Sequence, residues 1–214
     1  MKKISLIGFA MLLFSGTGWA GSVGNITRLS GVMHAMQASG VSGQLSVNSG
    51  VREGDTLKTE KGASARISFS DGGVIILRPE TELRIEAYSY QLVPMAGHPD
   101  NIVLNLIKGG LNSETGLLGK RSPNNFKVNT SVATIRVRGT HFNVLLCNND
   151  CGSIPPISGH ALQNGLYADT TQGKILVANF AGSIEVPAGS FSYTPGPNMA
   201  PRLVPPGYAG DKTP

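Results

Sequence analysis

Two cysteines, Cys147 and Cys151, carry the most reactive side chains of the chain, and three residues (Asn-Asn-Asp) separate them. In an oxidising compartment this spacing predicts a disulfide that closes a turn. Loop-closure entropy for so small a ring contributes about 2 kcal/mol. A redox-active pair would have a two-residue spacing at a helix start, which this sequence lacks. A metal site would need two more ligands, for which His141 and His160 are the nearest candidates. We favour the structural disulfide over the redox and metal alternatives.

Neither the histidines nor the hydroxyl residues form a catalytic pattern. The four histidines are scattered without the His-x-x-x-His spacing of metal ligands. Thr140 and His141 are neighbours in a predicted strand, so their side chains point to opposite faces and cannot act as nucleophile and base. Glu80, Glu82 and Glu86 fall in or beside a charged strand face, where solvation is the simplest interpretation. We therefore predict no catalytic residue, no metal and no cofactor, and a protein that is not an enzyme.

The segment from Gly116 to Ser122 (Gly-Leu-Leu-Gly-Lys-Arg-Ser) is the nearest approach to a phosphate-binding loop. A Walker loop requires four residues between its glycines and a Ser or Thr directly after the lysine. Here two residues separate the glycines, and Arg121 follows Lys120. We therefore expect a solvated basic loop.

The elements that must position these residues are predicted to be short strands. The chain has 214 residues with 28 glycines and 13 prolines, and only 14% of its residues are Asp, Glu, Lys or Arg. An average soluble protein has about half this share of glycine and roughly 25% charged residues. This composition argues against a coiled coil, a helical bundle or a charged disordered chain, and it favours many turns.

Alternation of apolar and polar residues indicates where the strands lie. Residues 63–70 alternate, Asp71-Gly72-Gly73 provides a turn, the apolar residues 74–77 follow, and residues 83–87 alternate again. We expect these three strands to form a meander. Strands spaced in this way indicate an all-β fold, a sandwich or a roll of short antiparallel strands, with β-solenoid-like stacking as an open alternative. Further short strands are predicted at 102–106, 126–128, 135–138, 142–144, 166–168, 175–177, 184–186 and 191–193.

Residues 1–20 have the organisation of a signal peptide. Lys2 and Lys3 precede an apolar run over residues 4–14, and Gly18-Trp19-Ala20 offers small residues for cleavage before Gly21. A run of this length is short for a hydrocarbon core of roughly 30 Å, although an uncleaved anchor is the alternative. We predict an exported protein, periplasmic or secreted in a Gram-negative bacterium, with no membrane span after signal cleavage.

The mature chain is expected to hold an all-β region over residues 21–193 and a tail over residues 194–214. The tail contains six of the 13 prolines and few large apolar residues, so we expect a flexible, partly polyproline spacer. Loss of Lys2 and Lys3 leaves 16 basic residues against 13 acidic residues, a net charge of +3. This weak balance argues against a nucleic-acid partner, which requires clustered phosphate contacts.

Several segments of the all-β region resemble the FecR domain. The first three contain Gly54-Asp55 with Thr59, an alternating strand into Asp71-Gly72, and Pro79-Glu80-Thr81. The later ones lie at 106–111, 126–130 and 133–142, and the last ends in Val137-Arg138-Gly139-Thr140-His141-Phe142, the Val-Arg-Gly-Thr-x-Phe pattern of that family. Their order and spacing together make the resemblance specific. It covers residues 49–145, and the additional predicted strands lie within 162–193.

The residues that carry this resemblance are expected to have scaffold roles. Asp55 and Asp71 each adjoin a glycine, which suits turns in which a carboxylate accepts bonds from backbone N–H groups. Arg138 is a candidate partner for one of these carboxylates, and the alternative is that it binds an anionic ligand. Gly139 is expected to mark a bulge or a close backbone approach, and Thr140 to bond neighbouring backbone.

The resemblance implies export, a β-rich domain and protein–protein binding in the cell envelope. In the transmembrane regulators of iron–siderophore signalling that gave the domain its name, a cytoplasmic segment controls a sigma factor. Only three residues precede the apolar run here, so we do not extend that activity to this chain. We expect a sensory, scaffold or assembly module that binds an envelope protein, for example by adding a strand at an exposed sheet edge. The alternative is a module that binds a surface glycan or another ligand, for which exposed aromatic residues along a groove would be the sign.

Overall fold

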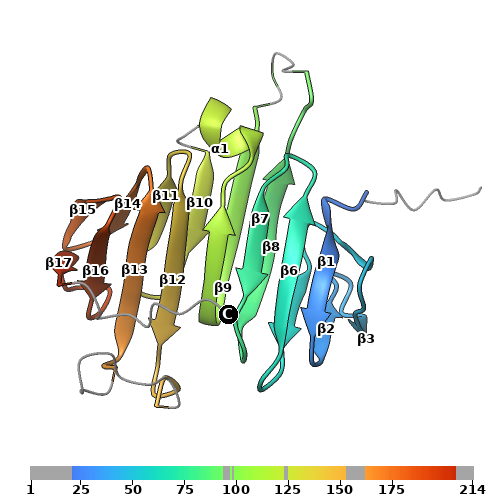
Figure 1. The fold of residues 1–214 in the computed structure, drawn as a ribbon, viewed down its shortest axis with the longest axis horizontal. Helices are drawn as coiled ribbons and strands as arrows, with labels where there is room; N and C mark the ends of the chain where they lie inside the picture. Colours follow the sequence, from blue (N-terminus) through green and yellow to red (C-terminus); the bar gives the residue numbers. More distant parts are fainter. Residues whose placement is uncertain (1–20, 94–96, 98, 123–124, 153–161, 206–214) are drawn as a thin grey trace, which may run out of the picture.

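The computed structural model describes residues 21–93, 97, 99–122, 125–152 and 162–205, which form an all-β molecule elongated along one axis (Figure 1). The predicted all-β class is thereby confirmed. The predicted signal peptide, His98, His160 and residues 206–214 of the predicted tail lie outside the described residues. Within the described part, no helix has the length and apolar character needed to cross a membrane.

The strands form two layers, sheet A and sheet B, that share one long strand, β9 (Asn101–Glu114). Neighbouring strands are antiparallel except for β9 and β10, which run parallel. In spatial order sheet A contains β4 (Gly50–Val51), β1 (Gly24–Ser30), β6 (Ser64–Phe69), β7 (Val74–Leu77), the second part of β9, β12 (His141–Cys147), β13 (Gly165–Gln172), β16 (Ser190–Thr194) and β17 (Arg202–Val204). Sheet B contains β3 (Ser42–Gln44), β2 (Met33–Met36), β5 (Thr56–Thr59), β8 (Glu82–Ser89), the first part of β9, β10 (Phe126–Asn129), β11 (Thr134–Val137), β14 (Lys174–Asn179) and β15 (Gly182–Pro187).

Strand β9 passes from one layer to the other at a pair of glycines. Its residues 101–108 pair with β8 in sheet B, and its residues 109–114 pair with β12 in sheet A. The change falls at Gly109, whose φ of +79° is readily adopted only by glycine. We expected the strand to end before Gly109-Gly110. The two glycines instead bend a strand that continues to Glu114.

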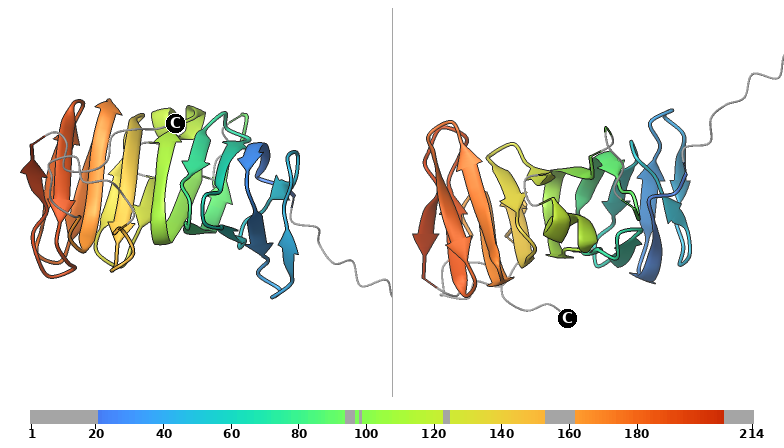
Figure 2. Two further views of the ribbon diagram at one scale, coloured as in Figure 1. Left: turned by 60° about the horizontal axis from the view of Figure 1, so that its bottom comes forward. Right: turned by 90° about the horizontal axis from the view of Figure 1, so that it is seen from above.

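The chain advances along the long axis while it alternates between the two layers (Figures 1 and 2). The β6–β7 hairpin lies in sheet A, but the next strand, β8, lies in sheet B. The predicted meander is therefore wrong, because β7 and β8 pair with different parts of β9 and not with each other. Both strands direct apolar side chains at one core, and the chain reaches the opposite layer after Pro79. The arrangement is a solenoid-like sandwich.

The core consists of the inward-facing residues of both layers. Alternate residues of each strand are buried, as the period of two requires. Leu57, Leu83 and Leu104 of sheet B and Ile67 and Phe142 of sheet A are all fully buried in one continuous cluster.

Strands β1 to β5 lie within the region that was predicted to be all-β, but the sequence pattern did not locate them individually. Toward the C-terminus, β17 pairs with β16, which corrects the predicted flexible tail from residue 194 onward. Within the described residues the only helix is α1 (Leu117–Arg121), which lies at one end of β9 (Figure 1).

Candidate functional site

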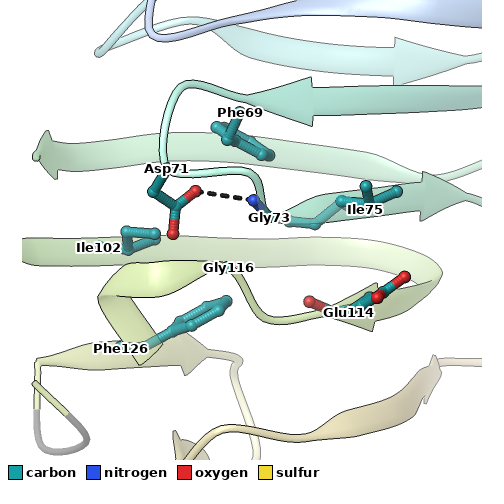
Figure 3. A pocket seen from close by; sticks show the side chains of 10 residues that line it. Phe69, Asp71, Gly73, Ile75, Ile102, Glu114, Gly116 and Phe126 are labelled. Carbon is teal, nitrogen blue, oxygen red and sulfur yellow. Dashed lines mark hydrogen bonds between the residues drawn. The ribbon is translucent and has the colours of Figure 1, made fainter. Parts of the chain in front are cut away.

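Asp71, in the turn between β6 and β7, is only 2% exposed. Its Oδ1 accepts the N–H of Gly73 at 3.0 Å (Figure 3), and its Oδ2 accepts the N–H of Leu118 at 3.3 Å. Its backbone carbonyl accepts the N–H of Leu117 at 2.9 Å. Asp71 thus caps helix α1 from a distant part of the chain. The prediction of a solvated basic loop at residues 116–122 is wrong, because this segment forms α1, with Leu118 buried against the core.

Tyr88 completes the bonding of this turn. Its hydroxyl donates to Asp71 Oδ1 at 3.3 Å and accepts the N–H of Asp71 at 3.0 Å. Burial is the main reason that the pKa of Tyr88 is raised to about 12. The phenol is therefore a neutral hydrogen-bonding group at physiological pH.

A small pocket, partly open to solvent, lies beside the Asp71 turn (Figure 3). Its only buried hydroxyl, that of Ser113, has no hydrogen-bond partner among the described residues. Glu114 lies at the pocket with its Oε1 at 3.1 Å from Nε2 of His141. Among the described side chains that line this pocket, no nucleophile lies beside a base. The apolar walls are formed by Phe69, Val74, Ile75, Ile102 and Phe126.

Asp55 lies in the turn that precedes β5. Its Oδ2 accepts the N–H of Arg52 at 2.9 Å, and Gly54 adopts a φ of +85°. Burial raises the pKa of the Asp55 carboxyl, while the hydrogen bond from Arg52 and its positive charge act in the opposite direction.

Thr59 and Thr81 support the bend of β9. The hydroxyl of Thr81 donates to the carbonyl of Gly110 at 2.9 Å and accepts the N–H of Gly110 at 3.0 Å. The hydroxyl of Thr59 donates to the carbonyl of Arg78 at 2.6 Å and accepts the N–H of Thr81 at 3.0 Å. These side chains satisfy backbone groups at the place where β9 leaves one layer for the other. The role of Thr81 was not predicted, although its place in the Pro-x-Thr segment was a signal.

The Val137–Phe142 segment connects β11 to β12 across the two layers. Val137 and Phe142 are fully buried in the core, and Gly139 adopts a φ of +65° between them. The N–H of Thr140 donates to Oγ1 of Thr115 at 2.8 Å, and the N–H of Thr115 donates to the carbonyl of Thr140 at 3.1 Å. The side chain of Thr115 and the backbone of Thr140 therefore fasten this crossing to the end of β9. The buried hydroxyl of Thr140 has no hydrogen-bond partner among the described residues, so the prediction that it bonds neighbouring backbone is wrong.

Arg138 does not form the carboxylate pairing that we expected. It is exposed, and within the described part of the chain it makes no ion pair with Asp55 or Asp71. Asp55 and Asp71 are instead buried in their turns, where their carboxylates accept backbone N–H groups. Gly72 is exposed in its turn with a φ of +81°.

Cys147 and Cys151 form a disulfide, as predicted. It packs on the outer face of sheet A in a second apolar cluster with Leu145, Tyr167 and Tyr193. The two tyrosine rings stack with their centroids 4.7 Å apart. Since both sulfurs are bonded to each other, neither is available as a thiolate ligand. Among the described residues, no group of three His, Cys, Asp or Glu side chains could hold a metal ion.

The aromatic side chains do not line a groove in the described part of the chain. Most are buried or half-buried, and two of them, Tyr167 and Tyr193, belong to the disulfide cluster. Phe180 is the exception, at 95% exposure in the turn between β14 and β15. Asn179 fixes this turn, because its Nδ2 donates to the carbonyls of Gly196 at 3.0 Å and Met199 at 2.7 Å.

Comparison with known proteins agrees with this geometry. Residues 55–153 match the model of the family described as FecR protein. Two solved structures, each described as a "putative anti-sigma factor" from Parabacteroides distasonis ATCC 8503, are similar at 16% sequence identity, with TM-scores of 0.51 and 0.50. Both alignments cover 70% of this chain and 58% of the other chain, so this chain spans well under two thirds of their length. None of the curated proteins matches the sequence.

At 16% identity the likeness to the solved structures shows a shared fold alone. The described residues form a two-layer β domain in which buried polar side chains bond the protein's own turns. The FecR family match covers residues 55–153, and this stretch of the chain is similar to that family.

Proposed function

We propose that this protein is an exported regulatory module that works by binding another protein in the cell envelope. The observation that carries the proposal is the FecR domain at residues 55–153. Its buried aspartates and threonines bond to the protein's own backbone, as shown for Asp71 and Thr81. These side chains build the scaffold, which leaves exposed strands and side chains to make the contact. A sensory, scaffold or assembly role fits such a module.

The strand edges at the two ends of the sandwich support binding by strand addition. Among the described residues, β3 and β15 each pair on one side only, and so does β17. An extended segment of a partner can add to such an edge through backbone hydrogen bonds. Phe180 is held beside the β15 edge as an apolar contact for the same partner. The alternative, a glycan ligand, has less support, because Phe180 is the single aromatic residue among the exposed large apolar side chains of the described part of the chain.

Export is part of the proposal and has its own test. Cells that produce the full chain are fractionated, and the mass of the recovered protein is measured. A periplasmic or secreted product that begins at Gly21 is expected. A cytoplasmic product that retains residues 1–20 would contradict the proposal.

Binding is tested by photocrosslinking in intact cells. A photoreactive phenylalanine analogue replaces Phe180. A matched control places the same analogue at Leu117, which is half exposed at the start of α1 and far from the β15 edge (Figure 1). We expect one envelope protein to be captured from position 180 and not from position 117. Capture of glycan alone, or of nothing from either position, would reject the proposed function.

A further inference from the structure

The outer face of sheet A carries three arginines on its first strands. Arg28 of β1 lies directly opposite Arg66 of β6, and both are exposed. Arg78, which follows β7, is half-buried on the same face, where its side chain lies 3.0 Å from the Cβ position of Gly110. We call Arg28, Arg66 and Arg78 the arginine face.

A β-bulge creates the closest pair of this face. The register between β1 and β6 shifts between Ile26 and Arg28. In a regular strand Arg28 would lie on the same side as Ile26, which is fully buried. The extra residue, Thr27, turns Arg28 outward, opposite Arg66. Bulges are a common device for re-aiming a side chain.

The pair is unfavourable for the protein alone. Directly opposite side chains in an antiparallel pair have their Cβ atoms about 4.5–5.5 Å apart, and like charges at this distance destabilise the sheet. Strands β1, β6 and β7 contain no Asp or Glu. Within the described chain neither Arg28 nor Arg66 forms an ion pair. The repulsion is thus not relieved inside the molecule.

The surroundings suit an anion. Ser30 and Ser64 face each other across the same two strands, one pair further along the outer face, and their hydroxyls can donate hydrogen bonds. Two carboxylates on the outer face of sheet A are those of Glu114, which lies opposite Val74 of β7, and Asp169 on β13. Glu114 is paired with His141, and Asp169 accepts a hydrogen bond from Asn143 at 2.7 Å. Asp169 also interacts electrostatically with Arg78, so the charge available to an anion comes mainly from Arg28 and Arg66.

We propose that the arginine face binds an acidic segment of the partner protein. Guanidinium groups bind carboxylates through paired hydrogen bonds, and two adjacent guanidiniums fit two carboxylates of one segment. The inference rests on the proposed protein-binding function and specifies the chemistry of the partner.

The first test uses a fluorescein-labelled peptide of ten glutamates, with fluorescence anisotropy at low ionic strength, where exposed charges are least screened. The Arg28→Gln/Arg66→Gln double variant should bind about tenfold more weakly than the unchanged protein. The control is Lys127→Gln/Arg136→Gln. It removes the same charge from a like-charged pair that is also directly opposite, but on the outer face of sheet B. This control should change the affinity for the peptide less than about twofold, because it leaves the arginine face intact. Long-range attraction by net charge alone would instead weaken binding equally in both variants.

Three outcomes of the peptide test would overturn the inference. They are equal weakening in both double variants, no binding by the unchanged protein, and tighter binding of polygalacturonate than of the peptide with the same arginine dependence. The last outcome would assign the face to an anionic glycan. Circular dichroism should show that both double variants remain folded, because the replaced side chains lie on outer faces.

The second test separates this inference from the proposed function. The crosslinker at position 180 is combined with Arg28→Gln/Arg66→Gln in intact cells. Loss of partner capture supports the arginine face. Capture at the unchanged level rejects the arginine face while the proposed function stands. If the protein with its arginines intact captures nothing, the proposed function fails, and the peptide measurement alone decides the inference.

Discussion

The two halves of the sandwich, before and after β9, are stabilised in different ways. In the first half, buried polar side chains such as Asp71 and Thr81 bond the turns and crossings from within. In the second half, a disulfide and stacked tyrosines form an additional apolar cluster on the outer face of sheet A. As a result the first six residues of β13 are buried on both sides of the sheet, whereas β6 alternates between buried and more accessible positions. The outer face of sheet A is therefore covered at β13 and accessible at β6.

The strongest expected effect falls on the junction between the halves. A Cβ at Gly109 would lie 2.5 Å from Thr81 Oγ1 and 2.7 Å from Thr81 Cα, at a φ of +79°. Gly109→Ala should therefore lower the free energy of unfolding by more than about 3 kcal/mol, because it causes both a steric clash and backbone strain. Urea unfolding followed by circular dichroism measures it.

Gly62→Ala is the matched control for this substitution. Gly62 has a φ of +72° but no atom within 4 Å of its Cβ position. Gly62→Ala should therefore lower the free energy of unfolding by about 1 kcal/mol, from backbone strain alone. Equal losses in the two variants would show that the bend of β9 tolerates a side chain.

The polar support of the first half is tested at Thr81. Thr81→Val removes the hydroxyl that bonds both backbone groups of Gly110, and leaving these buried groups unpaired should cost about 2–3 kcal/mol. Thr81→Ser keeps the hydroxyl and should lose less than half as much. Hydrogen exchange should show the loss first at β7 and β9. If Thr81→Val is as stable as Thr81→Ser, the hydroxyl of Thr81 does not support the bend of β9.

The second half should respond to loss of the disulfide. Cys147→Ala/Cys151→Ala opens a small ring and should cost about 2 kcal/mol. Exchange protection should fall at β13 and remain at β7, because the second apolar cluster belongs to one half only. Equal loss of protection in the two strands would show that the halves do not differ in this way.

Asp55 gives the first half a pH dependence. Because its pKa is raised in the folded state, the native protein holds this proton more tightly than the unfolded chain. Stability should therefore fall as pH rises from about 4 through the folded pKa. Asp55→Asn keeps an acceptor for the N–H of Arg52 and should remove this fall, with a gain of about 1 kcal/mol or less at pH 7. If Asp55→Asn keeps the full pH dependence of the free energy of unfolding, another group causes that dependence.

The smallest expected effect concerns the arginine face. Arg66→Gln relieves the repulsion with Arg28 and should raise stability by a few tenths of a kcal/mol. Thermal unfolding at low salt measures it, and added salt should shrink the difference. A loss of stability in Arg66→Gln would mean that the pair is not repulsive in the folded protein.

Local patterns in the sequence predicted the strand class and several of its turns. Alternation located β6, and Asp71-Gly72 located the turn after it, because period and turn chemistry are local properties. The destinations of the strands were not predictable in this way. Gly109-Gly110 reads as a turn, but long-range bonds from Thr81 keep β9 continuous through it. Helix α1 was missed for a similar reason, since its cap, Asp71, lies 47 positions away from Leu118.

The order in which the strands pair has a consequence for how the chain folds during synthesis or transport. Among the described residues, no strand after β9 pairs with a strand before it. A chain that emerges with its N-terminus first can therefore complete the layers up to Glu114 before the rest appears. The finished half then offers the unpaired edge of each part of β9 as a template, the first part for β10 and the second part for β12. Such stepwise growth limits the time during which unpaired apolar strands are exposed to aggregation.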